Sequence, residues 1–218
     1  HHTLPKYFGR LAGSLVGRLM FVRRVGGLAI DGTMIVLAFS GSLRTSSWNT
    51  LLIKLAVSEL RARGVVVDEW DFRAANVPLY DPDTSDEDPA PGLVDFRERV
   101  AKSQAVLVSS PEYNYSIPGA LKNLLDYASR PPKLNPFKGK LAAQLGATPG
   151  VGGTLQAQVM LRHVLIGLQM HSLPGAFTLS HADEAFDARD QLKDEIHRKQ
   201  LSAFLGRFMA ELALRTRP

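Results

Sequence analysis

From residue 34 onward, short apolar runs alternate with stretches whose apolar positions recur at helical spacing. The apolar runs predict β-strands over residues 34–39, 65–72, 105–109 and 140–147, with a fifth near residues 170–177. The stretches between and after them predict helices over residues 49–63, 92–102, 118–129, 153–168 and 188–214. Five strands alternating with five helices through right-handed crossovers predict an α/β fold with an open, doubly wound parallel sheet.

Two segments fall outside this alternation. Residues 78–91 are acidic and Pro-rich without periodicity, which predicts a surface loop. Residues 1–33 precede the first clear strand and are interpreted as an N-terminal extension, either flexible or a tag or leader, with a basic surface-associating helix as the alternative. Residues 34–218 are then expected to form one domain, since 218 residues with 45% hydrophobic side chains suit a single sizeable core.

The net charge of +5 is unevenly distributed, because much of it comes from the extension. Its charged residues are Lys6, Arg10, Arg18, Arg23 and Arg24 against Asp31. The remaining chain is near neutral, so we expect no nucleic-acid partner. No apolar run approaches the roughly 20 residues that span a bilayer, so no membrane partner is expected. Without cysteine the chain lacks disulfides and thiolate metal sites, which fits the cytoplasm, and any redox chemistry needs a bound organic cofactor.

Candidate ligand chemistry lies in the loop after the first strand, residues 40–49, which we name the serine loop. Ligands of doubly wound sheets bind beyond the carboxyl ends of the strands, and this loop leads into a helix N-terminus that favours anions. Its sequence, SGSLRTSSWN, offers hydroxyl and amide donors and one guanidinium, but contains neither G-x-G-x-x-G nor G-K-[ST]. We therefore predict a site for a terminal phosphate; the alternative is an ordinary serine N-cap.

Two further loops are expected at the same edge of the sheet. The tyrosine loop, residues 110–118 (SPEYNYSIP), can hold a flat ring with Tyr113 or Tyr115 over one face; alternatively, Ser116 caps the next helix and the tyrosines lie at the rim. The glycine loop, residues 148–154 (TPGVGGT), either lets backbone approach a ligand closely or is a turn that needs positive φ.

Together these loops resemble two motifs of the NADPH-dependent FMN reductase family, which includes bacterial quinone, chromate and azo-dye reductases. The first motif, G-S-L-R-x-x-S-x-N, is matched by Gly41, Ser42, Leu43, Arg44, Ser47 and Asn49. The second, P-E-Y-N-x-S-x-P-G-x-L-K-N, is matched by Pro111, Glu112, Tyr113, Asn114, Ser116, Pro118, Gly119, Leu121, Lys122 and Asn123. The similarity extends over about residues 34–177, so the N-terminal extension lies outside it.

The resemblance implies a flavodoxin-like three-layer sandwich around a five-stranded parallel sheet of order 2-1-3-4-5. It implies that the serine loop holds the phosphate of FMN through Ser42, Arg44, Ser47 and Asn49, beside Trp48 and Thr50. It also implies that the isoalloxazine is bordered by Pro111, Glu112, Tyr113, Asn114 and Ser116, and by Gly152, Gly153 and Thr154. Family members usually form homodimers or homotetramers with the flavin near the interface, where residues 79–81 would contribute.

The function that the resemblance implies is hydride transfer from NADPH or NADH through bound FMN to a small-molecule acceptor: a quinone, a flavin, an azo compound or a metal oxyanion. No catalytic side chain is nominated, because the cofactor carries the chemistry. No metal site is expected either, since His163, His171, His181 and His197 lack close, same-face spacing. One alternative is a flavodoxin-type electron carrier. Such carriers generally present a strongly acidic docking surface, and the near-neutral charge of residues 34–218 argues against this reading. Another is a nucleic-acid or membrane-associated protein that acts through the basic extension.

Overall fold

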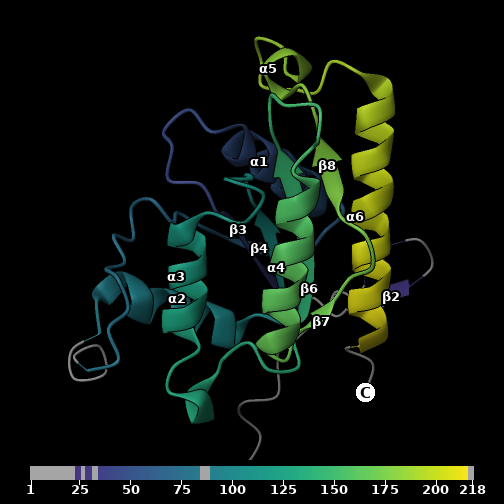
Figure 1. Ribbon diagram of the computed structural model, residues 1–218. Coiled ribbons are helices and arrows are strands. Elements are labelled where there is room, and N and C mark those ends of the chain that lie inside the picture. Colours follow the sequence, from purple (N-terminus) through teal and green to yellow (C-terminus); the bar gives the residue numbers. More distant parts are fainter. Residues whose placement is uncertain (1–22, 26–27, 31–33, 84–88, 216–218) are drawn as a thin grey trace, which may run out of the picture.

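The computed structural model describes residues 23–25, 28–30, 34–83 and 89–215. The predicted extension therefore lies largely outside the described residues, as does part of the predicted acidic loop. Two short strands of the extension are described, β1 (Arg23–Val25) and β2 (Leu28–Ile30), and they pair antiparallel. The second of them lies beside the C-terminal helix (Figure 1).

A parallel sheet forms the centre of the fold. Its strands are β3 (Ile35–Ser40), β4 (Val66–Trp70), β5 (Ala105–Ser109), β6 (Leu141–Ala147), β7 (His171–Ser172) and β8 (Phe177–Leu179). They lie in the order β4-β3-β5-β6, and both β7 and β8 pair with β6, all in parallel. This confirms the predicted order 2-1-3-4-5, except that the fifth strand is split. The interruption contains Pro174, which has no backbone N–H to donate, and Gly175, whose φ is +77°.

Helices cover both faces of the sheet (Figure 1). Helices α1 (Trp48–Ala62) and α6 (Glu195–Arg215) pack on one face, and α2 (Pro91–Lys102), α3 (Gly119–Ala128) and α4 (Leu155–Gly167) pack on the other. A single turn of 3-10 helix (Pro132–Leu134) and the short α5 (Ala182–Ala185) lie in connections. The predicted helices are confirmed to within a few residues, apart from the start of the last one.

The C-terminal helix begins at Glu195, seven residues later than predicted. The preceding segment is held in a turn because a carboxylate oxygen of Asp187 accepts the backbone N–H groups of Arg189 and Gln191 at 2.8 and 2.9 Å. Short polar side chains that bond nearby backbone compete with helix formation in this way. The same bonds hold the pKa of Asp187 below its usual value, with the bond to Gln191 contributing most.

The side chains of β3 point alternately to the two faces of the sheet, which separates two hydrophobic cores. Val36 and Ala38 face α1 and α6, whereas Leu37 and Phe39 face α2 and α3, and all four are fully or almost fully buried. Such continuous apolar strands are typical of parallel sheets that are covered on both faces. The carboxyl ends of β3, β5 and β6 are therefore fixed by packing from both sides, and the three predicted ligand loops leave from these ends.

Candidate functional site

Serine hydroxyls shape the serine loop from within. The hydroxyl oxygens of Ser40 and Ser42 each accept the backbone N–H two residues further on, at 3.3 Å, and Ser47 caps α1 by accepting the N–H of Asn49 at 3.2 Å. All three side chains are buried. Since a hydroxyl has one hydrogen besides its two lone pairs, each of these serines can still donate that hydrogen to a ligand.

Backbone donors add to these hydroxyls. Among the contacts of the described residues, the backbone N–H groups of Thr45, Ser46 and Ser47 reach no protein acceptor. They directly precede α1, whose first turn also carries backbone N–H groups without acceptors inside the helix. Successive free N–H groups at such a position form an anion-binding concavity. These donors are of the kind that a phosphate would accept from, so the phosphate site stays a prediction that the loop's chemistry suits.

Asn49, which is predicted to hold the FMN phosphate, also makes contacts within the protein that the sequence does not reveal. Its side-chain amide donates to the carbonyl of Ala147 at 2.9 Å and accepts the Ala147 N–H at 2.9 Å and the Ser109 hydroxyl at 3.0 Å. The three residues are buried. The amide therefore clasps the start of α1 to the ends of β5 and β6, and both its polar atoms are occupied by protein partners.

Arg73 supports the serine loop from outside and was missed by the sequence reasoning. It follows β4, and its guanidinium donates to the carbonyl oxygen of Leu43. Its backbone N–H is in turn held by the carboxylate of Asp71 at 3.0 Å. Nothing in the local sequence distinguishes Arg73 from an ordinary surface arginine, because the contact joins segments 30 residues apart.

A tight hairpin forms the middle of the tyrosine loop. Tyr113 and Ser116 exchange backbone hydrogen bonds of 2.9 and 3.0 Å around Asn114 and Tyr115, whose φ angles are +49° and +62°. Consecutive positive φ angles characterise the type I′ turn. Both tyrosines are exposed, and Ser116 does not cap α3, because the N-cap is Pro118 and makes no side-chain cap bond.

Glu112 links the tyrosine loop to the glycine loop. Its carboxylate accepts the backbone N–H of Ala157 at 3.0 Å in the first turn of α4, where a negative charge is favourable. In the glycine loop, Gly153 and Thr154 have φ angles of +61° and +63°. A side chain at Gly152 would meet no atom within 4 Å. The positive φ favours glycine at 153, and a side chain at position 152 would extend into open space.

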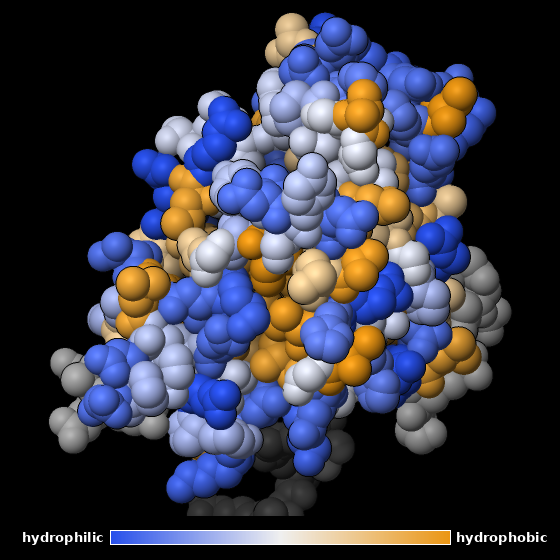
Figure 2. Space-filling model, viewed as in Figure 1, coloured by the Kyte–Doolittle hydropathy of each residue, from blue (hydrophilic) through white to orange (hydrophobic). Residues whose placement is uncertain are grey.

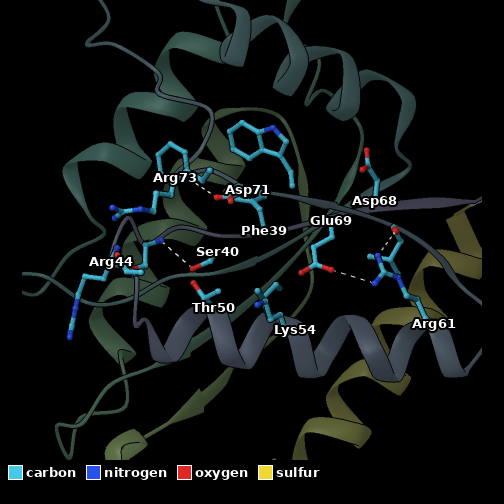
Figure 3. Close-up of a pocket in the computed structure, with 16 residues that line it drawn as sticks. Phe39, Ser40, Arg44, Thr50, Lys54, Arg61, Asp68, Glu69, Asp71 and Arg73 are labelled. Carbon is cyan, nitrogen blue, oxygen red and sulfur yellow. Dashed lines mark hydrogen bonds and ion pairs between the residues drawn. The ribbon is translucent and has the colours of Figure 1, made fainter. Parts of the chain in front are cut away.

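Two cavities flank the serine loop, and Figure 3 shows the larger of them. One of about 740 Å³ extends between α1 and β4 and is lined by Ser40, Ser42, Arg44 and Thr50 among others. A second, of about 490 Å³, lies between the serine loop and the tyrosine loop and is lined by Arg44, Tyr113 and Pro118. Trp48 turns elsewhere, since its ring stacks on Phe186 with centroids 5.9 Å apart.

The described residues contain no group of three or more His, Asp or Glu side chains that could hold a metal ion. Within that same part of the chain, no helix has the length and apolar character needed to cross a bilayer. What the carboxyl edge does present is a set of neutral donors, two exposed arginines, Arg44 and Arg73, and two exposed tyrosines. An edge of this kind, on a flavodoxin-like sheet, defines a binder of a phosphorylated, ring-bearing cofactor.

Comparison with known proteins identifies the family. The family model for NADPH-dependent FMN reductases matches residues 34–184. An NAD(P)H-dependent FMN reductase of Pseudomonas aeruginosa is 41% identical over 173 residues, covering 77% of this chain and 91% of the relative. A quinone reductase of Pseudomonas putida is 35% identical over 176 residues, covering 80% of this chain and 92% of the relative.

A solved structure agrees with these sequences. The flavoenzyme FerB of Paracoccus denitrificans, an NAD(P)H:acceptor oxidoreductase, superposes with a TM-score of 0.74 at 32% identity, over 84% of this chain and 98% of that one. The chain belongs to the NADPH-dependent FMN reductase family. It is an FMN-dependent oxidoreductase that uses NAD(P)H, and the predicted family, fold, enzyme class and cofactors are confirmed.

Proposed function

We propose that the chain reduces quinones with NAD(P)H on an FMN whose phosphate lies in the serine loop. The observation that carries this assignment is the set of unused donors at the start of α1. Three backbone N–H groups and three serine hydroxyls of the serine loop donate to no protein acceptor among the described residues. Arg44 adds a charged donor that makes no ion pair within the described chain. A phosphate monoester can accept from all of these groups at once.

The side chains predicted to hold FMN divide into two roles in this proposal. Ser42, Arg44, Ser47 and the helix start bind the phosphate, with Thr50 at the border of the cavity. Asn49 instead fixes the loop through its three buried bonds, and Trp48 supports it by stacking on Phe186.

The ring of the flavin would lie between the tyrosine and glycine loops. The backbone N–H groups of Glu112 and Asn114 reach no protein acceptor among the described residues, so they are available to the polar edge of the ring. Gly152 leaves space for a close approach, and Tyr113 borders the cavity on the side of the serine loop. When bound, FMN supplies the transfer of hydride and electrons between nicotinamide and acceptor. The protein contributes orientation and hydrogen bonds to developing negative charge.

Quinones are the acceptor that the relatives support. Curated relatives from Pseudomonas putida and Arabidopsis thaliana are named quinone reductase and NADPH:quinone oxidoreductase, at 35% and 34% identity. The exposed tyrosines and the open glycine loop leave room for a flat, neutral acceptor above the ring. An electron carrier would need no such room, since its partner docks from outside.

We further propose that two chains associate through α4. Leu155, Val159, Met160 and Ile166 are exposed on this helix, and Figure 2 shows apolar side chains gathered along the middle of the same face. A contiguous apolar surface beside a ligand site marks an interface. The stripe begins next to the glycine loop, so a second copy would cover the flavin.

We also propose that residues 34–218 form the FMN-binding domain, with residues 1–33 outside it. We propose that the enzyme works in the cytoplasm, which the lack of cysteine supports.

The test is turnover without a partner protein. The purified chain, loaded with FMN under anaerobic conditions, should lose its flavin absorbance on addition of NADPH and regain it on addition of a benzoquinone. Steady-state oxidation of NADPH should then require the quinone and no other protein. Absorbance that NADPH and NADH both leave unchanged, but that a separate reductase bleaches, would assign the chain to the electron carriers instead.

A further inference from the structure

The larger of the two cavities carries groups that FMN binding leaves unused. It extends from the serine loop along α1, away from the tyrosine loop, and Figure 3 shows Lys54 lying in it between Thr50 and Glu69. Thr50 and Lys54 are one helical turn apart, so both side chains face the same side of α1. The cavity of about 740 Å³ is large for an ion and suits part of a nucleotide.

The charges in this cavity favour an anion. Its carboxylates already have partners: Glu69 pairs with Arg61 at 3.4 Å, Asp68 pairs with Arg99, and Asp71 accepts backbone N–H groups. Lys54, in contrast, makes no hydrogen bond or ion pair among the described residues. An ammonium left without a counter-ion beside hydroxyl groups is suited to a phosphate.

The two cavities adjoin one another. Both are lined by Arg44, Thr45 and Arg73, so these residues stand at the boundary between the compartment that reaches Tyr113 and the compartment that contains Lys54. With Arg44 on the FMN phosphate, a second ligand can run from the tyrosine loop past the guanidinium of Arg73 into the larger cavity. A nicotinamide dinucleotide has this layout, since its pyrophosphate joins the reacting ring to an adenosine end.

We propose that the larger cavity binds the adenosine end of the dinucleotide and that Lys54 with Thr50 recognises a ribose 2′-phosphate. This rests on the proposed function, because Tyr113 is taken to lie beside the flavin ring. NADPH carries that phosphate, whereas NADH carries a hydroxyl that gains little from an ammonium. The Glu69 carboxylate, which could otherwise bond the 2′-hydroxyl of NADH, is paired with Arg61. The cavity thus selects NADPH over NADH.

The test compares two ligands that differ only in the 2′-phosphate, adenosine 2′,5′-bisphosphate and 5′-AMP, by calorimetry on the FMN-loaded protein. The unaltered chain should bind the bisphosphate more tightly, and Lys54→Met should reduce that preference by roughly tenfold to a hundredfold, the loss of one charge-assisted bond. The ratio of kcat/KM for NADPH to that for NADH should fall in parallel. Lys102→Met, which removes an exposed lysine at the end of α2 that does not line the cavity, should leave both ratios unchanged.

Equal binding of the two ligands by the unaltered chain, or a Lys54→Met variant that keeps the full preference for the 2′-phosphate, would overturn the assignment. The FMN content and the bleaching by NADPH are measured on the same preparations. A chain that takes up no FMN refutes the proposed function, and the calorimetric comparison still decides the role of Lys54 on its own. A Lys54→Met variant that loses FMN affinity but retains the nucleotide preference places the lysine at the flavin phosphate and refutes the proposal.

Discussion

Replacing Asn49 by alanine removes the clasp that joins the serine loop to the ends of β5 and β6. The substitution leaves the N–H and carbonyl of Ala147 and the hydroxyl of Ser109 without partners in a buried place. A buried polar group that loses its partner costs about 1–3 kcal/mol, and water entering the gap recovers part of this. We expect the free energy of unfolding to fall by about 3 kcal/mol, a large share of the roughly 5–15 kcal/mol typical of a domain.

Ser109→Ala provides the matched control. It removes one of the three bonds and leaves the exchange between Asn49 and Ala147 in place, so the expected loss is about 1 kcal/mol. Urea denaturation of the FMN-free proteins measures both changes, and FMN titration follows on the same samples. If Asn49→Ala unfolds like the unaltered chain without FMN but binds FMN far more weakly, the side chain belongs to the ligand and the clasp has no energetic role.

Three further outcomes are expected. Gly146→Ala should destabilise the chain by about 2 kcal/mol in urea denaturation, because the new methyl group would lie 2.0 Å from the Thr154 hydroxyl. Gly167→Ala, in open space at the end of α4, should be neutral or stabilising. Equal losses of stability in the two variants would contradict the packing argument. Glu112→Ala should cost about 1 kcal/mol through loss of its bond in the first turn of α4, while Glu112→Gln, which keeps an acceptor, should cost less. The pKa of Asp187 is lowered in the folded chain, so its carboxylate stabilises the fold above its unfolded pKa and ceases to do so as the pH falls through the folded pKa. The difference in free energy of unfolding between the unaltered chain and Asp187→Asn should therefore disappear on acidification. A difference that persists in acid would refute this.

The strands and most helices were predictable because each depends on local periodicity, whereas the strand order 2-1-3-4-5 came from the resemblance to the family. β5 is apolar throughout, which is the pattern of a strand covered on both faces, and α1 follows from its spaced leucines and the Ser47 cap. The start of α6 was not predictable from periodicity, because the turn held by Asp187 overrides a sequence that also suits a helix.

The candidate site likewise has parts that local sequence can predict and parts that it cannot. The serine loop could be proposed as a phosphate site from the sequence, since donor-rich side chains next to a helix N-terminus are visible there. The clasp by Asn49 and the support from Arg73 were not identifiable, because they join segments 98 and 30 residues apart. The role proposed for Lys54 was not predictable for another reason. In the sequence it is one lysine on the polar side of a helix, and only the cavity beside it indicates a role.

Comparing FMN with riboflavin tests the central claim most directly, because the two ligands differ only in the phosphate assigned to the serine loop. Fluorescence titration of the flavin-free chain should show FMN binding at least about a hundredfold more tightly than riboflavin, which corresponds to about 3 kcal/mol from the donors at the start of α1. Equal affinities for the two flavins would mean that the phosphate lies elsewhere, and the assignment of the serine loop would be wrong.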